Sequence, residues 1–276
     1  MRIPIYQIDA FAERLFTGNP AAVVITEEEL PSRTMQAIAS ENNLAETAFV
    51  YGDLNSPSIR WFTPTVEVDL CGHATLAAAH VMLMHYLEGS DSVSFSSRSG
   101  LLQVFRAEEL LWLDFPRDHV EPFENVRSSV ADALQSNVDL VFKGRSDFLA
   151  ILPSQSAVED LHPNMDRINE LRARGLIVSA EGNDVDFVSR FFAPQSGIPE
   201  DPVTGSAHTT LTPYWSAILG KSEMNARQLS MRGGRLRCRM MGERVHIGGS
   251  AVTYLEGHID INNGRQCDAP DASRRR

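Results

Sequence analysis

The sequence has few cysteines, no long apolar run and a deficit of positive charge, and each shortage excludes a class of protein. Three widely spaced cysteines in 276 residues predict neither a disulfide framework nor a zinc-ligand pair, so a reducing cytoplasm is the expected compartment. The N-terminus is too polar for a signal sequence, and no apolar run could span a bilayer. A formal net charge of −11 argues against nucleic acid or an anionic membrane as the main partner, because both need clustered Lys and Arg.

The length and the order of predicted elements indicate a duplicated fold. With 43% hydrophobic and 22% charged residues, the chain is long enough for two domains with a sizeable core. Strand, helix, two strands, apolar helix and further strands occur twice, as in a duplicated α+β unit. A boundary is expected at residues 116–122. The predicted domains are residues 1–117 and 118–256, and a C-terminal strand near 257–276 is a candidate to return to the first.

Two glycine turns stand where a strand ends and a helix begins. Cys71–Ala74 opens a helix that runs to about His85, and Thr204–Ala207 opens another that runs to about Leu219. The first helix has almost no polar face, so it is predicted to be buried. A Gly-rich helix start presents backbone N–H groups and a positive dipole end to a carboxylate or phosphate. The pair predicts one anion held between two halves; the alternative is two ordinary helix starts.

Glu46 lies in the predicted strand Ala45–Tyr51, where alternation places it on the same face as Ala48 and Val50. If that face is the apolar one, loss of water raises the pKa of Glu46 towards neutrality. Such a pKa suits a group that both takes and gives a proton. The alternative is a glutamate at a strand start that stays in contact with water.

Cys71 and His73 flank Gly72 and leave several functions open. They can be a nucleophile pair or a metal pair, or His73 can hydrogen-bond a ligand from the helix start. Residues two apart at a helix start do not face each other, so a close pair is not predicted. The helix dipole is expected to lower the pKa of Cys71. No metal site is predicted, because His73 and His80 are two turns apart and Cys71 has no second thiol nearby.

Asp201 and Ser206 belong to the second glycine turn. Asp201 is either a helix-capping acid or a polar ligand to a substrate amine. Ser206 is not a nucleophile elbow, which would need a second glycine two residues after the serine.

Four segments of the chain resemble the motif set of the phenazine-biosynthesis isomerase (PhzF-like) family. They are Phe16–Ala21, Asn43–Phe49, Asp69–Thr75 and Glu200–Ala207, in the family's order and spread over most of the chain. The resemblance implies an α+β fold similar to that of diaminopimelate epimerase, with two similar domains related by a pseudo-twofold. Each domain is then a curled sheet around a central apolar helix, the active site lies between them, and the protein is a homodimer.

The resemblance also implies roles for single residues. Glu46 falls on the family's catalytic glutamate, which moves a proton across a cyclic amino-acid substrate without a cofactor, and His73 and Asp201 fall on its other polar active-site positions. Related epimerases place one cysteine at each glycine turn. This chain keeps Cys71 at the first turn but has Thr204 at the second, which argues against a two-thiol racemase. The predicted substrate-binding residues are Asn19, Gly72, Ala74, Thr204, Gly205 and Ser206.

The predicted function is a cofactor-independent isomerase. It moves a proton on a small, carboxylate-bearing, amino-acid-like substrate, with Glu46 as general acid and base. The alternatives are a two-base racemase or epimerase that uses Cys71, a hydrolase or transferase with Cys71 as nucleophile, and a binding module without catalysis. Neither the substrate nor a phenazine pathway follows from the sequence.

Overall fold

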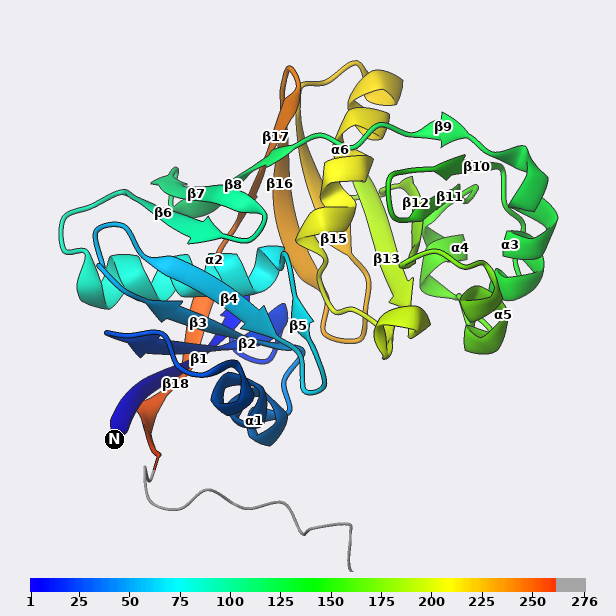
Figure 1. Cartoon of the computed structure of the whole chain (residues 1–276). Helices are drawn as coiled ribbons and strands as arrows, with labels where there is room; N and C mark the ends of the chain where they lie inside the picture. Colours follow the sequence, from blue (N-terminus) through cyan, green and yellow to red (C-terminus); the bar gives the residue numbers. More distant parts are fainter. Residues whose placement is uncertain (262–276) are drawn as a thin grey trace, which may run out of the picture.

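The computed structural model describes residues 1–261, in which 18 strands join one curled mixed sheet. In the first half the strands are β1 (Arg2–Ala10), β2 (Asn19–Thr26), β3 (Glu46–Tyr51), β4 (Ser58–Phe62), β5 (Glu67–Val68), β6 (Ser92–Ser97), β7 (Gly100–Ala107) and β8 (Leu110–Pro116), with helices α1 (Ser32–Asn42) and α2 (Gly72–Val81). In Figure 1, α2 lies along these strands and α1 lies outside them.

The second half has a similar arrangement around α6 (Gly205–Leu219). Its strands are β9 (Glu121–Pro122), β10 (Leu140–Lys143), β11 (Phe148–Ile151), β12 (Leu176–Glu181), β13 (Phe187–Ala193), β14 (Ile198–Glu200), β15 (Glu223–Gln228), β16 (Gly234–Met241) and β17 (Arg244–Gly249), followed by β18 (Ala251–Asp260). Three further helices, α3 (Arg127–Leu134), α4 (Gln155–Glu159) and α5 (Met165–Glu170), lie at the far end of this half (Figure 1).

The strand pairings of the two halves repeat. Strands β2 and β3 are parallel, as are β11 and β12; β4 and β6 are parallel, as are β13 and β15. The antiparallel series β6–β7–β8 corresponds to β15–β16–β17. The predicted α+β fold with pseudo-twofold repetition is confirmed.

Two pairings connect the halves. Strand β8 pairs with β17, and β18 runs antiparallel to β1, from Ala10 opposite Ala251 to Arg2 opposite Asp260. The predicted C-terminal strand near 257–276 overlaps β18, and residues 262–276 lie outside the described part of the chain. The domain limits 1–117 and 118–256 stay a prediction.

Both central helices form from predominantly apolar sequence. In α2, Leu76, Ala77–Ala79 and Val81 are all buried, as the pattern predicted, and the helix continues as a π-helical turn over Met82–Tyr86. Helix α6 contains Pro213, which cannot donate to the carbonyl four residues earlier. The backbone N–H of Asp118 donates to that carbonyl, on Thr209, at 3.1 Å. The connection between the halves therefore completes the hydrogen bonding of α6.

An ion pair also occurs once in each half. Arg60 donates to both carboxylate oxygens of Glu67 at 2.7 and 2.8 Å, and Arg190 donates to both oxygens of Glu200 at 2.7 and 3.0 Å. Each guanidinium lies over the phenylalanine ring two residues later, 5.1 and 4.9 Å from the ring centroid. A feature present in both halves holds the sheet together and need not belong to a site.

Some element boundaries differ from the sequence prediction. The strand expected at 227–231 is β15, which ends at Gln228 because the next residues turn towards the first half, where the Gly18 N–H donates to the Gly233 carbonyl at 2.7 Å. The short elements β9, β14 and α4 were not predicted, and the strand expected to end at the first glycine turn is the two-residue β5. Among residues 1–261, none of the helices has both the length and the apolar character needed to cross a lipid bilayer.

Candidate active site

The two glycine turns meet. A methyl group added at Gly72 would lie 3.5 Å from the Cα atom of Gly205, and one added at Gly205 would lie 3.6 Å from the Cα atom of Gly72. The N-termini of α2 and α6 therefore abut at the centre of the molecule, where both positive dipole ends act on the same space. Ala74, two residues after Gly72, is buried in α2.

Polar side chains from both halves form a chain of contacts beside this point. His73 Nε2 lies 3.2 Å from Glu46 Oε2, without the alignment of a hydrogen bond. His73 Nδ1 lies 3.1 Å from Asn19 Nδ2, which also donates to Asp201 Oδ1 at 2.7 Å and to the Val203 carbonyl at 3.0 Å. The chain of contacts thus connects Glu46 of the first half to Asp201 of the second.

The hydrogen bonds of Asn19 decide which nitrogen of His73 carries a proton. Both Asp201 and the Val203 carbonyl accept, so the atom facing them is the amide nitrogen, which can only donate. The same nitrogen faces Nδ1 of His73 and cannot accept a proton from it, so Nδ1 is an acceptor that shares the two amide hydrogens with Asp201 and Val203. The proton of the His73 ring then lies on Nε2, on the side of Glu46. Burial lowers the pKa of His73 to about 3, so the ring is neutral near pH 7.

Glu46 is largely shielded from water. It begins β3 on the face that carries Ala48 and Val50, which belong to the core around α2, and its side chain is 17% exposed. Burial raises the pKa of Glu46 to about 8, and the Asp201 carboxylate adds to the rise. The alternation argument from the sequence therefore placed this side chain correctly. The alternative, a glutamate that stays in full contact with water, does not hold.

Asp201 is not the cap of α6, since Thr204 occupies the N-cap position. Thr204 Oγ1 donates to Asp201 Oδ2 at 2.6 Å. Burial raises the pKa of Asp201 to about 6, while the hydrogen bonds from Thr204 and Asn19 oppose that rise. The two carboxyl groups of the site therefore have different proton affinities, a common arrangement where one acid is protonated and the other ionised.

Two predictions about Cys71 are wrong. Its Sγ lies 3.5 Å from His73 Nδ1, so the pair is close. Cys71 precedes the first helical residue and has extended backbone, φ −144° and ψ 109°, so the spacing rule for helix faces does not apply to it. Burial, and then the Glu46 carboxylate, raise the pKa of Cys71 well above its usual range. These effects outweigh the helix dipole, and the thiol is not activated.

The fold brings together a set of metal-ligand types that linear spacing could not show. Glu46, Cys71 and His73 offer donor atoms that all lie within 4.8 Å of one another. Glu46 escapes a spacing argument because it comes from strand β3, whereas Cys71 and His73 lie at the start of α2. The Asn19 amide already donates to one ring nitrogen of His73, which restricts how this set can bind an ion.

Ser206 lies on the first turn of α6 and contacts a residue that the sequence did not single out. Arg174 donates to Ser206 Oγ at 3.1 Å and to Asp147 Oδ1 at 2.9 Å. Arg174 also lowers the pKa of Asp201, though less than the two hydrogen bonds do. A guanidinium thus stands at the second-half rim of the site.

A third set of contacts connects the turn before Asn19 to the second half. Arg232 donates to Asp9 Oδ1 at 2.7 Å and to the Gly18 carbonyl at 2.9 Å. Asp9 is 2% exposed, so this ion pair is partly shielded from water. It fixes the turn from which Asn19 enters the site.

Sequence reasoning missed three residues that shape the site: Arg174, Gln228 and Arg232. Gln228 had a usable signal, because it follows the buried Met224 and Ala226 at intervals of two and so lies on the same face of β15. A polar residue on a buried face needs hydrogen-bond partners. The two arginines had none, since their partners lie far away along the chain.

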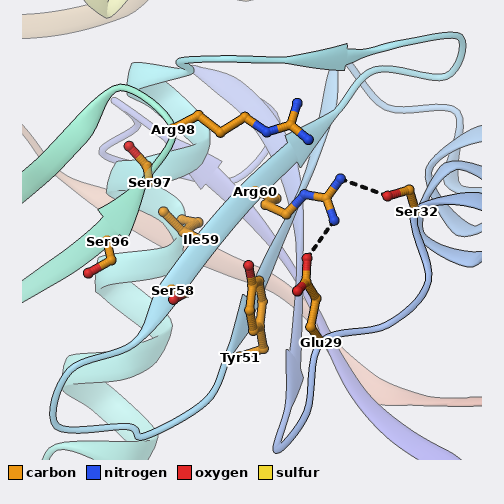
Figure 2. Close-up of a pocket in the computed structure, with 9 residues that line it drawn as sticks. All are labelled: Glu29, Ser32, Tyr51, Ser58, Ile59, Arg60, Ser96, Ser97 and Arg98. Carbon is orange, nitrogen blue, oxygen red and sulfur yellow. Dashed lines mark hydrogen bonds and ion pairs between the residues drawn. The ribbon is translucent and has the colours of Figure 1, made fainter.

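A separate hollow of about 540 Å³ lies at the outer edge of the first half. Figure 2 shows Arg60 there, between Glu29 and Ser32, to which it donates at 2.7 and 2.9 Å. Arg98 pairs with Glu67 at 2.9 Å. The two guanidinium groups are thus balanced by two carboxylates, and Arg60 repeats the ion pair of Arg190. The hollow is therefore a weaker candidate than the junction of α2 and α6.

Comparison with known proteins decides the family. Residues 8–257 match the family model described as phenazine biosynthesis-like protein. The chain belongs to the phenazine biosynthesis-like family. An uncharacterized isomerase of Pseudomonas aeruginosa is 48% identical over 264 residues, which cover 95% of this chain and 100% of that protein. The resemblance seen in the four motifs is confirmed.

Solved structures of the phenazine biosynthesis-like family share the fold. A crystal structure of a PhzF-family phenazine biosynthesis protein from Enterococcus faecalis has 43% identity and a TM-score of 0.89, over 95% of this chain and 100% of that one. A hydroxyproline epimerase from Agrobacterium vitis has 10% identity and a TM-score of 0.62 over 94% and 91% of the two chains. At that identity the likeness concerns the fold alone.

Proposed function

We propose that the protein is a cofactor-independent isomerase that uses Glu46 to remove a proton from one carbon of a small amino-acid-like substrate and return it to another. The observation that carries the proposal is the position of Glu46: a shielded carboxyl beside the junction of two helix N-termini, with its pKa raised to about 8. Near pH 7 roughly a tenth of such groups are ionised, so the same group can act as base and then as acid.

The other residues of the site have supporting roles in this proposal. The substrate carboxylate binds beside the junction of Gly72 and Gly205, where N–H groups and both helix dipoles favour an anion. His73, protonated on Nε2, holds the Glu46 carboxylate as it forms, and Asp201 receives a substrate amine. Glu46 returns as many protons as it takes, so substrate and product are isomers and the protein ends each cycle in its starting state. The proposal includes a homodimer, as the family resemblance implies.

The geometry does not favour the alternatives that rest on Cys71. Burial keeps Cys71 protonated, and the matching position of the second turn holds Thr204, whose hydroxyl is too weakly acidic to replace a thiol. A nucleophilic or two-thiol mechanism would need the opposite environment.

The experiment is a screen of amino acids and cyclic dienoic amino acids for enzyme-dependent deuterium uptake from heavy water, by mass spectrometry. A substrate should take up deuterium with the natural protein and with Glu88→Gln, which alters an exposed side chain. With Glu46→Gln the rate should fall at least about a hundredfold, the usual scale for a general acid and base. Undiminished uptake in Glu46→Gln would refute the role of Glu46.

A further inference from the structure

Gln228 is a buried amide whose contacts fix its orientation. It ends β15, and its side chain is fully buried, where an amide is costly unless hydrogen-bonded. Its Oε1 accepts from the Thr204 backbone N–H at 2.8 Å, and its Nε2 donates to the Asp201 carbonyl at 2.7 Å. A backbone N–H only donates and a carbonyl only accepts, so these two contacts decide which end of the amide is the nitrogen.

The orientation of Gln228 then fixes the direction of the Thr204 hydroxyl. Thr204 Oγ1 lies 3.1 Å from Gln228 Nε2 and receives its N–H. The hydroxyl hydrogen must therefore point elsewhere, and Asp201 Oδ2 accepts it at 2.6 Å. The other oxygen of Asp201 accepts from Asn19 at 2.7 Å, and the orientation of that amide is likewise fixed by a backbone carbonyl. A proton on either oxygen of Asp201 would face a group that itself donates.

We propose that Gln228 is a positioning residue that acts through Thr204: it directs the Thr204 hydroxyl at Asp201 and keeps Asp201 an acceptor at both oxygens. The charged or ionisable groups facing Asp201 are Arg174 and Glu200 from the second half and Glu46 from the first, with His73 and Cys71 uncharged beside Glu46. Burial and the Glu200 carboxylate favour a proton on Asp201, so the donated hydrogen bonds oppose them.

The consequence for catalysis rests on the proposed function. If Asp201 stays ionised, the mobile proton of the site stays on Glu46, which can then deliver it to the substrate. The effect of Gln228 on Asp201 itself does not depend on any substrate, so it can be tested in the free protein.

The test is a pH titration of Asp201, monitored by carbon-13 NMR of protein labelled at the aspartate carboxyl carbons. The Asp201 signal is identified as the one that is missing in Asp201→Asn. Gln228→Met removes the amide and keeps an unbranched side chain of similar length. We expect the proton affinity of Asp201 to rise about tenfold, because the Thr204 hydroxyl becomes free to turn away. Gln155→Met is the matched control. It removes a buried amide that contacts Glu159 and Asn183, and it should leave the titration of Asp201 unchanged.

A second variant separates an effect that passes through the Thr204 hydroxyl from a general loss of packing around Asp201. Thr204→Val removes the hydroxyl at the same shape and should raise the proton affinity of Asp201 by itself. Adding Gln228→Met should then change little more, because the group it directs is gone. Additive shifts in the double variant, or an unchanged Asp201 titration in Gln228→Met or Thr204→Val, would overturn the proposal. If Gln228→Met does not fold, Thr204→Val still tests the proposal, because an Asp201 titration unchanged without the hydroxyl would overturn it. A failed deuterium screen would count against the proposed function and leave this result intact.

Discussion

Strands β3 and β12 occupy equivalent places in the two halves, but they differ in one residue at the start of the strand. Thr47 lies opposite Phe62 and Leu176 lies opposite Phe192, so Glu46 in the first half corresponds to Gly175 in the second. A side chain at Gly175 would come within 2.3 Å of the Phe191 ring. Only one half has room for a carboxyl group there, which supports a mechanism in which a single acid carries the proton.

The helix starts differ in the same way. Gly72 and Gly205 face each other, but Cys71 and His73 in the first turn correspond to Thr204 and Ser206 in the second. In contrast, the ion pairs of Arg60 and Arg190 are alike in both halves. The comparison teaches that the shared features support the fold, whereas the features found in one half are the candidates for chemistry.

The largest effect is expected at Glu46, the carboxyl group that only the first half contains. On one substrate, Glu46→Gln should lower deuterium uptake at least about a hundredfold, whereas Cys71→Ser should retain most of the activity because the buried thiol carries no proton in a one-base reaction. Initial rates from mass spectrometry give the ratio. Equal and severe loss in both variants would instead show a two-base epimerisation.

The raised pKa of Glu46 also predicts a pH dependence of stability. Its pKa rises from 4.5 to about 8 on folding, so the folded state binds the proton more tightly. The resulting stability is full below about pH 4.5 and is lost as the pH rises through 8; it is worth at most about 5 kcal/mol. Asp201, with its pKa raised to about 6, contributes to the lower part of this range.

Urea unfolding at pH 6 and pH 8 measures this effect. The free energy of unfolding should fall between the two pH values for the natural protein and for Glu88→Gln, and it should fall much less for Glu46→Gln. A slope that Glu46→Gln leaves intact would show that another group is responsible.

The paired arginines test the shared part of the comparison. Arg60→Met and Arg190→Met each leave a carboxylate without its main partner, so each should lower the free energy of unfolding by roughly 3 kcal/mol. Deuterium uptake per folded molecule should not change in either. If Arg60→Met remained folded but lost uptake, the hollow of Figure 2 would belong to the active site.

The smallest effect tests whether the second half has room for a side chain at Gly175, the position equivalent to Glu46. Gly175→Ala should lower the free energy of unfolding by about 2 kcal/mol, because the added methyl group overlaps the Phe191 ring. Gly257→Ala is the control, since its methyl group would lie 3.8 Å from Leu255, an ordinary contact. Equal stability of the two variants would mean that Phe191 can move aside.

The sequence predicted those features that depend on local pattern. The apolar runs after Cys71 and Ser206 gave both central helices, because a helix without a polar face must be buried. Alternation placed Glu46 on the core side of β3 because a strand has a period of two. The repeat of glycine turns pointed to the junction of α2 and α6, although only the fold could show that they touch.

The contacts that set proton affinities could not be read from the sequence. Arg232 and Asp9 are 223 residues apart, and Gln228 lies 24 residues from Thr204, so no local pattern connects them. The wrong expectation for the pKa of Cys71 has the same origin. A helix dipole is visible in a sequence, but the burial of Cys71 that outweighs it exists only in the folded core.

The pairing of β18 with β1 has a consequence for biosynthesis. Strand β1 finds one of its two neighbours in residues 251–260, which are translated long after it. The sheet of the first half cannot close until residues 251–260 have been translated, so until then one edge of β1 stays open to solvent or to a chaperone. The candidate site draws Glu46 from the first half and Asp201 from the second, so the closed sheet that supports it forms only after residues 251–260 have been made.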